Sequence, residues 1–255
     1  MRLGLSTALV AQGPALRQMS GSPLFADGQV GFQFDPSVSS SMSVARDGSG
    51  PTPAIGDVVG RIEDISGNGF AAVAPSDASR PRLEMVRGRP ALSFDGVDDV
   101  LRLANMTFGP LFSVFVGFEH FSNGMVLGAL SGATPPINKV IRAGSNRVKL
   151  DYPDAAGTDQ LLTAEYGINP SEVYVGGLAD SLTLDVEGMS VETKSVPGGL
   201  AEVTSELFIG DGAVGGGDPI EMALFGMVVY PTATVDSSTE AAARAWLSTQ
   251  TGRVT

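Results

Sequence analysis

A succession of short strand-like segments separated by turn residues is the feature that most constrains the fold of this chain. Period-two alternation places Phe32 and Phe34 on one face of the segment 31–35. The segment 111–118 is a continuous apolar run, which is typical of a strand buried on both faces. Gly, Pro, Asn and Asp separate the segments. This order predicts an all-β antiparallel sandwich or barrel rather than βαβ units.

The expected strands run through most of the sequence. They are 31–35, 58–65, 82–86, 91–94, 100–103, 111–118, 125–130, 139–143, 147–152, 172–176, 181–186, 190–194, 206–210 and 220–230. Residues 36–57 are rich in Ser, Gly, Pro and Asp and predict a long loop. Gly144, Ser145 and Asn146 predict a hairpin connection.

One segment near the end departs from the β pattern and predicts a helix over 234–250. Asp236 or one of the two serines after it can cap the N-terminus, and the alanines that follow have high helix propensity. One face of this helix carries Ala242, Ala245 and Trp246. We therefore expect Trp246 to anchor the helix in the core, and Gly252 to end it.

Composition limits the classes of function. The 255 residues suit one large domain or a domain with a tail, and 43% are hydrophobic, enough for a sizeable core. The net charge of −12 repels nucleic acids and anionic membranes. No apolar run approaches the roughly 18 residues of a membrane span. With no Cys and one His, any bound metal is expected to be a hard cation held by oxygens.

Two Gly-Asp motifs carry a family resemblance: D-I-S-G-N-G at 64–69 and L-S-F-D-G-V-D-D at 92–99. The F-D-P segment at 34–36, L-F-I-G-D-G at 207–212 and the ending R-A-W-L-S-T-Q-T-G add to it. This arrangement resembles the laminin G-like branch of the concanavalin A-like lectin/glucanase superfamily, in the form found in tailed-phage and prophage virion proteins. The resemblance extends over about residues 30–253.

The resemblance implies an antiparallel two-sheet jelly-roll sandwich at 29–255, with a C-terminal helix, preceded by a tail at 1–28. It further implies a non-enzymatic virion protein of a phage or phage-like particle, namely a head or tail fibre, a spike or a decoration subunit. Such a protein assembles in the bacterial cytoplasm and is expected to bind host surface polysaccharide. The alternatives are a glycoside hydrolase on the same fold and a structural spacer without ligand, because this fold hosts all three.

The tail is expected to contact other virion subunits or a neighbouring copy of the chain in a homo-oligomer. Leu3, Leu5, Leu9 and Val10 are too apolar for a freely solvated tail and too few to form a core of their own. The alternative is that residues 3–9 form an ordinary edge strand of the domain.

Clustered aspartates are the candidates for a metal site. No cofactor is required by the motifs, but calcium is possible, since it prefers carboxylate and carbonyl oxygens. The favoured ligands are Asp64, Asp95, Asp98 and Asp99, with a second site at Asp211 and Asp218. The alternative is that these aspartates bond to turn backbone, as Asx residues commonly do.

Exposed aromatic residues near polar groups are the candidates for sugar stacking. They are Tyr152, Tyr166, His120 and Phe121. Glucanases of this superfamily carry acidic residues in alternation on one strand. The nearest match here is T-L-D-V-E at 183–187, where Thr183 replaces the first acid and Glu187 adjoins a hairpin glycine. We expect this segment to be a solvated hairpin without catalytic function.

Overall fold

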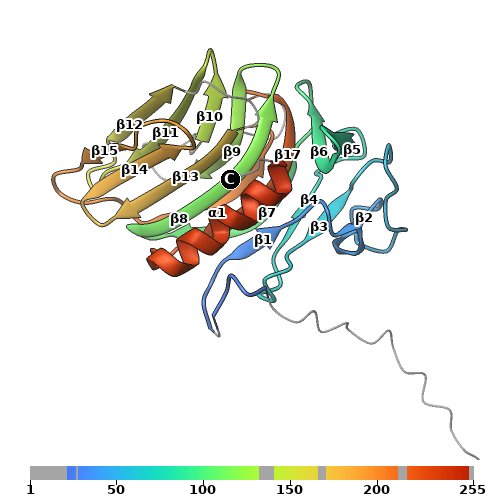
Figure 1. Cartoon of the computed structure of the whole chain (residues 1–255), viewed down its shortest axis with the longest axis horizontal. Coiled ribbons are helices and arrows are strands. Elements are labelled where there is room, and N and C mark those ends of the chain that lie inside the picture. Colours follow the sequence, from blue (N-terminus) through green and yellow to red (C-terminus); the bar gives the residue numbers. More distant parts are fainter. Residues whose placement is uncertain (1–21, 27, 132–140, 166–170, 212–216, 253–255) are drawn as a thin grey trace, which may run out of the picture.

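The computed structural model describes residues 22–26, 28–131, 141–165, 171–211 and 217–252. Within these residues, two antiparallel sheets face each other across one core, and an α-helix lies against the outside of one sheet (Figure 1). This arrangement confirms the all-β sandwich with a C-terminal helix.

The first sheet has the helix on its outer face. In order across the sheet it contains β15 (Glu192–Ser195), β14 (Ser181–Val186), β13 (Ser171–Leu178), β8 (Leu111–His120), β17 (Glu221–Tyr230), β6 (Arg89–Asp95) and β5 (Arg82–Val86). The short β1 (Phe32–Phe34) extends the same edge of β17 that β6 occupies, because β6 pairs with 221–224 and β1 with 227–229.

The second sheet covers the other side of the core. It contains β12 (Asp159–Glu165), β11 (Arg147–Pro153), β10 (Ile141–Gly144), β9 (Gly124–Ser131), β16 (Val203–Ile209), β7 (Leu101–Phe108), β4 (Ala71–Val73), β3 (Arg61–Glu63) and β2 (Met42–Ser43). A 3-10 turn, η1 (Ser39–Ser41), precedes β2. The sequence did not predict β2, β4 or β12. The first two are very short, and β12 sends only Leu162 and Ala164 to the core.

The central strands β8 and β17 are buried on both faces, as the apolar run at 111–118 predicted. Phe112, Val114 and Phe118 of β8 lie in the main core between the sheets. Phe115 lies on the opposite face of the same strand, in a second apolar cluster beneath the helix. The side-chain alternation of a strand therefore supplies both layers of packing.

Helix α1 (Ser237–Thr251) begins and ends as its sequence indicates. Asp236 caps it, since its Oδ1 accepts the Thr239 N–H at 2.7 Å, and Gly252 ends it with a φ of 76°. None of the described helices has the length and apolar character of a membrane span.

The buried face of α1 differs from the predicted one. Ala242 and Ala245 are exposed and Trp246 is half-buried, whereas the buried residues are Ala243, Leu247, Ser248 and Thr251. Polar contacts explain the difference. Ser248 Oγ donates to Glu172 of β13 at 2.9 Å, and Arg244 pairs with Asp185 of β14 at 2.7 Å. Alanine spacing carries no information about such contacts, because alanine is compatible with either environment.

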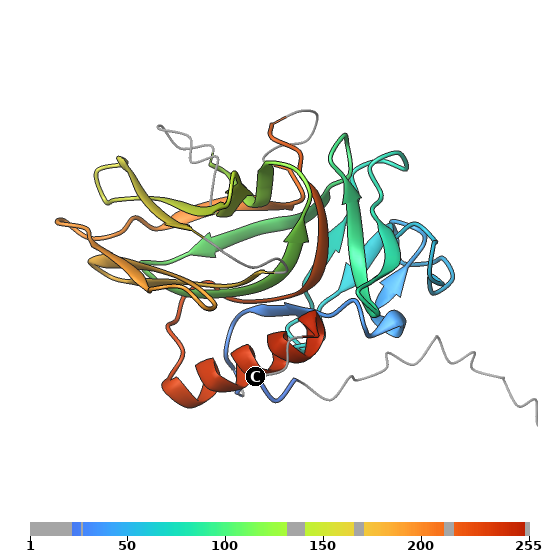
Figure 2. The same cartoon turned by 45° about the horizontal axis from the view of Figure 1, so that its top comes forward.

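Helix α1 lies along the outer face of the first sheet, as Figure 2 shows in side view. Two glycines allow this close approach. Gly117 and Gly226 are direct partners across β8 and β17, beside a register shift in β17. A Cβ on Gly226 would lie 2.5 Å from Cη2 of Trp246, and one on Gly117 would lie 2.9 Å from Cγ2 of Thr251. The half-buried Trp246 thus packs on bare backbone, and its Nε1 donates to Asp35 at 3.3 Å.

The described end of the predicted tail also packs on this face. Leu24 is buried, and the Phe25 ring stacks on Tyr230 with 4.6 Å between centroids. The Tyr230 hydroxyl donates to the Leu24 carbonyl at 2.6 Å. Residues 22–26 therefore pack against the sandwich, while residues 1–21 lie outside the described residues.

Replacement of Gly226 by alanine tests this close approach. We expect Gly226→Ala to lower the free energy of unfolding by about 1–3 kcal/mol, the usual cost of overpacking, measured by urea denaturation. Gly109→Ala is the matched control, since the nearest atom to its Cβ lies 3.8 Å away. The double variant Gly226→Ala/Trp246→Ala should lose less than the sum of its single variants, because the two residues are in contact. Additive losses would contradict this packing.

Candidate functional site

A surface groove of about 700 Å³ lies beside the β5–β6 hairpin. Its walls come from β5, the loop 77–80, the turn 95–99 and the junction of β8 with β17. The polar and aromatic lining comprises Asp77, Arg80, Arg82, Glu84, Ser93, Phe94, Asp95, Asp99, Phe121 and Glu221. Asp95 and Asp99 were singled out in the sequence separately from Phe121, and the three residues meet in one groove.

The F-D-G-V-D-D motif forms the turn at one end of this groove. Asp95 Oδ1 accepts the Val97 N–H at 2.8 Å, and Asp99 Oδ2 accepts the Asp95 N–H at 3.0 Å. Gly96 has a φ of 73°, and a Cβ there would lie 2.9 Å from the Glu221 nitrogen. Asx bonding and a required glycine together explain why this motif builds a tight turn against β17.

The same turn concentrates negative charge. One carboxylate oxygen from each of Asp95, Asp98 and Asp99 lies within 4.8 Å of the other two. Burial, followed by the charges of Asp95 and Asp98, raises the pKa of Asp99 to about 7. The Arg82 guanidinium acts weakly in the opposite direction.

Phe121 lies at the groove with 54% of its surface exposed. Its backbone is fixed, because the Phe121 N–H donates to the Glu221 carbonyl at 2.8 Å and the Glu221 N–H donates to Ser122 Oγ at 2.8 Å. The exposed ring therefore stands on an ordered strand junction.

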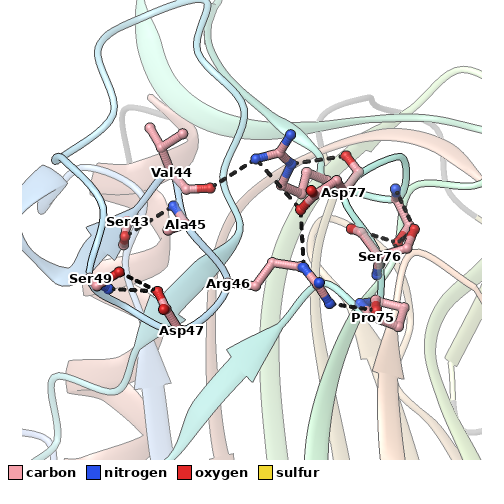
Figure 3. A network of polar contacts seen from close by, with 11 residues as sticks. Ser43, Val44, Ala45, Arg46, Asp47, Ser49, Pro75, Ser76 and Asp77 are labelled. Atoms are coloured by element: carbon pink, nitrogen blue, oxygen red, sulfur yellow. Dashed lines mark hydrogen bonds and ion pairs between the residues drawn. The ribbon is translucent and has the colours of Figure 1, made fainter.

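A network of arginine contacts holds the loop 77–80, which forms another wall of the groove (Figure 3). Arg46 donates to the Pro75 carbonyl at 2.7 Å and pairs with Asp77 at 3.1 Å. Arg80 donates to the Asp77 carbonyl at 2.9 Å and to the Val44 carbonyl at 3.2 Å. Sequence inspection missed Arg80, as well as Arg82, Glu84 and Glu221, because isolated charged residues in strands and loops carry no motif.

Asp64 does not join the other favoured metal ligands. Its Oδ1 accepts the N–H groups of Gln33 and Ser66 at 2.8 and 2.7 Å, and its Oδ2 accepts the Ser66 hydroxyl at 2.6 Å. Asn68 of the same motif donates to the Gly31 carbonyl at 2.9 Å. The D-I-S-G-N-G motif thus ties the chain before β1 to the turn after β3.

The second predicted metal pair is occupied by protein contacts. Asp211 Oδ1 accepts the Asp218 N–H at 2.7 Å, and Asp218 forms an ion pair with Arg142. Residues 212–216 between these two aspartates lie outside the described residues.

The aromatic candidates separate into different environments. Tyr152 corrects the prediction of an exposed sugar-stacking residue, because it is 2% exposed in the main core. Its ring stacks on Phe112 at 4.7 Å, and its hydroxyl donates to the Gly109 and Ala201 carbonyls, each at 3.2 Å. Strand alternation, rather than the Pro153 after it, fixes the direction of this side chain. Tyr166 lies outside the described residues.

His120 is half-buried at the end of β8, and burial lowers the pKa of its imidazole. Its ring lies 6.2 Å from the Phe118 ring, centroid to centroid. His120 is not among the residues that line the groove, although Phe121 follows it directly.

A further cavity of about 300 Å³ lies between α1 and the first sheet and contains Glu172, Tyr174, Glu187 and Arg244. Burial and a hydrogen bond with Glu187 raise the pKa of Glu172 to about 7. Retaining and inverting glycosidases need carboxyl groups about 5–9.5 Å apart. The carboxyl groups of Glu172 and Glu187 share a hydrogen bond and therefore lie closer together than this. The Asp185 carboxylate is held in an ion pair with Arg244.

Comparison with known proteins shows the fold. No model of a known protein family matches this chain, and no curated protein sequence does. The solved binding domain of Paraclostridial Mosquitocidal Protein 1 superposes with a TM-score of 0.54 at 11% identity, over 72% of this chain and 49% of that one. Trypanosoma rangeli sialidase gives 0.54 at 14% identity, over 96% of this chain and 36% of that one.

The binding domain of botulinum neurotoxin serotype D, solved in complex with N-acetylneuraminic acid, gives a TM-score of 0.51 at 8% identity, over 72% and 48% of the two chains. The chain thus spans half or less of the length of each of these structures. At such low identities the shared property is the β-sandwich fold.

Calcium binding at the 95–99 turn stays a prediction. We expect 2 mM calcium to raise the unfolding free energy by about 1–2 kcal/mol relative to chelator, if the dissociation constant is on the order of 0.1 mM. Thermal melts measure the shift. Asp98→Asn should abolish it, whereas Asp159→Asn, an exposed control in β12, should not. Coincident curves with calcium and chelator would show that these aspartates serve the turn alone.

The raised pKa of Asp99 predicts that the stability of the protein depends on pH. Its folded-state pKa of about 7 exceeds the unfolded value, so the folded state retains a proton that the unfolded state releases. Stability should therefore fall as pH rises from about 4 to 7. Asp99→Asn should flatten that fall by about 1 kcal/mol or more, measured by urea unfolding at pH 5 and 8. The pKa of Glu172 is also raised, so Glu172 adds to the pH dependence of the wild type and of Asp99→Asn alike, and its contribution cancels from their difference. Parallel pH profiles would contradict the assignment.

Proposed function

We propose that this chain is a non-enzymatic carbohydrate-binding protein that holds a saccharide in the groove beside β5 and β6. The observation that carries the proposal is the exposed Phe121 ring set among convergent charged groups. Ligand sites commonly combine an apolar surface with a few well-placed polar groups that fix orientation. A sugar ring presents both a C–H face for an aromatic side chain and hydroxyls for hydrogen bonds.

The polar groups suit hydroxyl recognition. Arg82 donates to the Gly56 carbonyl at 2.9 Å, which fixes its guanidinium at the groove. Glu84 lies on the same outward face of β5, two residues further along. Arginine and carboxylate side chains present paired donors and paired acceptors, and vicinal hydroxyls of a sugar can engage either kind. Charged partners also strengthen such hydrogen bonds.

The wider proposal places this module on a tailed-phage or phage-like particle, as a fibre, spike or decoration subunit that binds host surface polysaccharide. Two structural observations support it. The motifs at 64–69 and 92–99, which carry the resemblance, form tight turns, and residues 22–26 lead the chain onto the outer face of the sandwich. The tail at 1–28 would then join other virion subunits or a second copy.

A glycoside hydrolase remains the rival function. The sialidase among the structural neighbours is an enzyme by name, and Glu172 with Glu187 forms an acidic pair. Their hydrogen bond and the Arg244–Asp185 ion pair favour a structural role for these acids in docking α1. Release of reducing ends from a polysaccharide that is lost in Asp185→Asn would support the hydrolase instead.

Glycan-array binding by the full chain tests the proposal. We expect a subset of bacterial surface glycans to bind, and Phe121→Ala to weaken that binding about tenfold, since one stacking contact is worth roughly 1–1.5 kcal/mol. Leu178→Ala is the control, because Leu178 is also exposed, at 48%, but lies on β13 away from the groove. An array that stays blank with and without calcium would support a structural spacer. Equal binding by Phe121→Ala would place the site elsewhere.

A further inference from the structure

A second cavity, of about 300 Å³, lies over the β10–β11 hairpin. It is lined by Asn123, Arg142, Ala143, Gly144, Ser145, Arg147 and Lys149. Three of these residues are cations and none is a carboxylate. The whole chain has 16 Lys and Arg against 28 Asp and Glu, so a lining of this composition runs against the charge of the rest of the molecule.

The strand register brings two of the cations together. Arg142 of β10 and Lys149 of β11 are direct cross-strand partners. Both point away from the core, because Ile141 and Val148, their neighbours in the chain, are buried in it. Like charges that face each other directly across strands destabilise a sheet. The pair therefore costs stability unless anionic groups offset it.

The cations differ in their partners. Arg142 pairs with Asp218 and Arg147 pairs with Glu165 at 3.2 Å, and both acids stand outside the cavity lining. Lys149 has no ion pair within the described part of the chain. Two guanidinium groups are thus paired with acids outside the cavity lining, while the Lys149 ammonium has no such partner among the described residues.

Neutral polar groups complete the cavity. Asn123 Oδ1 accepts the Ser145 N–H at 2.8 Å and so ties the tip of the hairpin to the strand connection before β9. A Cβ on Gly144 would lie 2.3 Å from that Oδ1, so only glycine lets Asn123 lie against the turn. The Asn123 Nδ2 donates to the Ser145 hydroxyl at 3.4 Å, and both groups stand beside the three cations in the cavity lining.

We infer that this cavity is a subsite for the anionic group of an acidic saccharide, either a uronic carboxylate or a sulfate ester. One charged group matches the uncompensated Lys149, while Arg142 and Arg147 supply planar donors suited to such oxyanions. Asn123 and Ser145 match neighbouring sugar hydroxyls. A nucleic acid, with its many phosphates, would meet repulsion from the remaining acidic surface. The saccharide part of this inference rests on the proposed function, but the cavity is separate from the groove.

Titration calorimetry on the full chain tests the subsite with four probes: oligomannuronate, sulfated dextran oligomers, neutral dextran oligomers of matched length, and sodium sulfate. We expect at least one acidic oligomer to bind at least about fivefold more tightly than the neutral one, with weaker binding at 500 mM than at 50 mM NaCl. Lys149→Gln should weaken acidic binding about three- to fivefold. Lys194→Gln, a lysine on β15 outside the cavity, should not change it.

Unchanged acidic binding by Lys149→Gln would overturn the inference, and so would equal binding of acidic and neutral oligomers. Sulfate alone binding as tightly as the acidic oligomers would also overturn it, by showing an anion site without saccharide recognition. The variants separate this subsite from the groove. Loss of neutral-glycan binding in Phe121→Ala concerns the groove, whereas a selective loss of acidic binding in Lys149→Gln concerns the hairpin cavity.

Discussion

The burial of β8 and β17 on both faces is the constraint on which the rest of the structure depends. Their inner side chains fill the core between the sheets, and their outer side chains support α1 and residues 22–26. Gly117 and Gly226 make the second layer possible by removing side chains where the helix lies. The helix covers part of the outer face of the first sheet, and the two cavities proposed as ligand sites lie away from it, at the β5–β6 edge and on the β10–β11 hairpin.

Acidic residues occupy three kinds of environment in this chain. Asp64, Asp95 and Asp236 accept backbone N–H groups and so define turns and a helix end. Asp185 and Glu172 bind side chains of α1 and dock it. Asp99 lies buried in the groove, where its raised pKa records an unfavourable environment for charge. Part of the acidic content of the chain therefore serves the construction of the fold, whereas the hairpin cavity is lined by cations.

Sequence reasoning succeeded where local chemistry determines structure. Alternation and apolar runs located most strands, Asx residues beside glycines located the two turns, and Asp236 and Gly252 marked the ends of the helix. It failed where tertiary contacts decide. The buried face of α1 depends on Glu172 and Asp185, which lie far from it in the sequence. Tyr152 is a different case, because its inward direction follows from the alternation in β11 that also buries Val148 and Leu150. The groove combines side chains from four segments whose proximity no local pattern encodes.

Amide chemical-shift mapping on the ¹⁵N-labelled full chain tests the central claim most directly, namely that ligand recognition lies at the edge of the sandwich. The titrant is the oligosaccharide that binds most tightly on the array. The account predicts that the largest shifts fall at residues 94–99, 121 and 221, and for an acidic ligand also at 142–149. Shifts confined to α1 and β13, around Glu172 and Arg244, would contradict it.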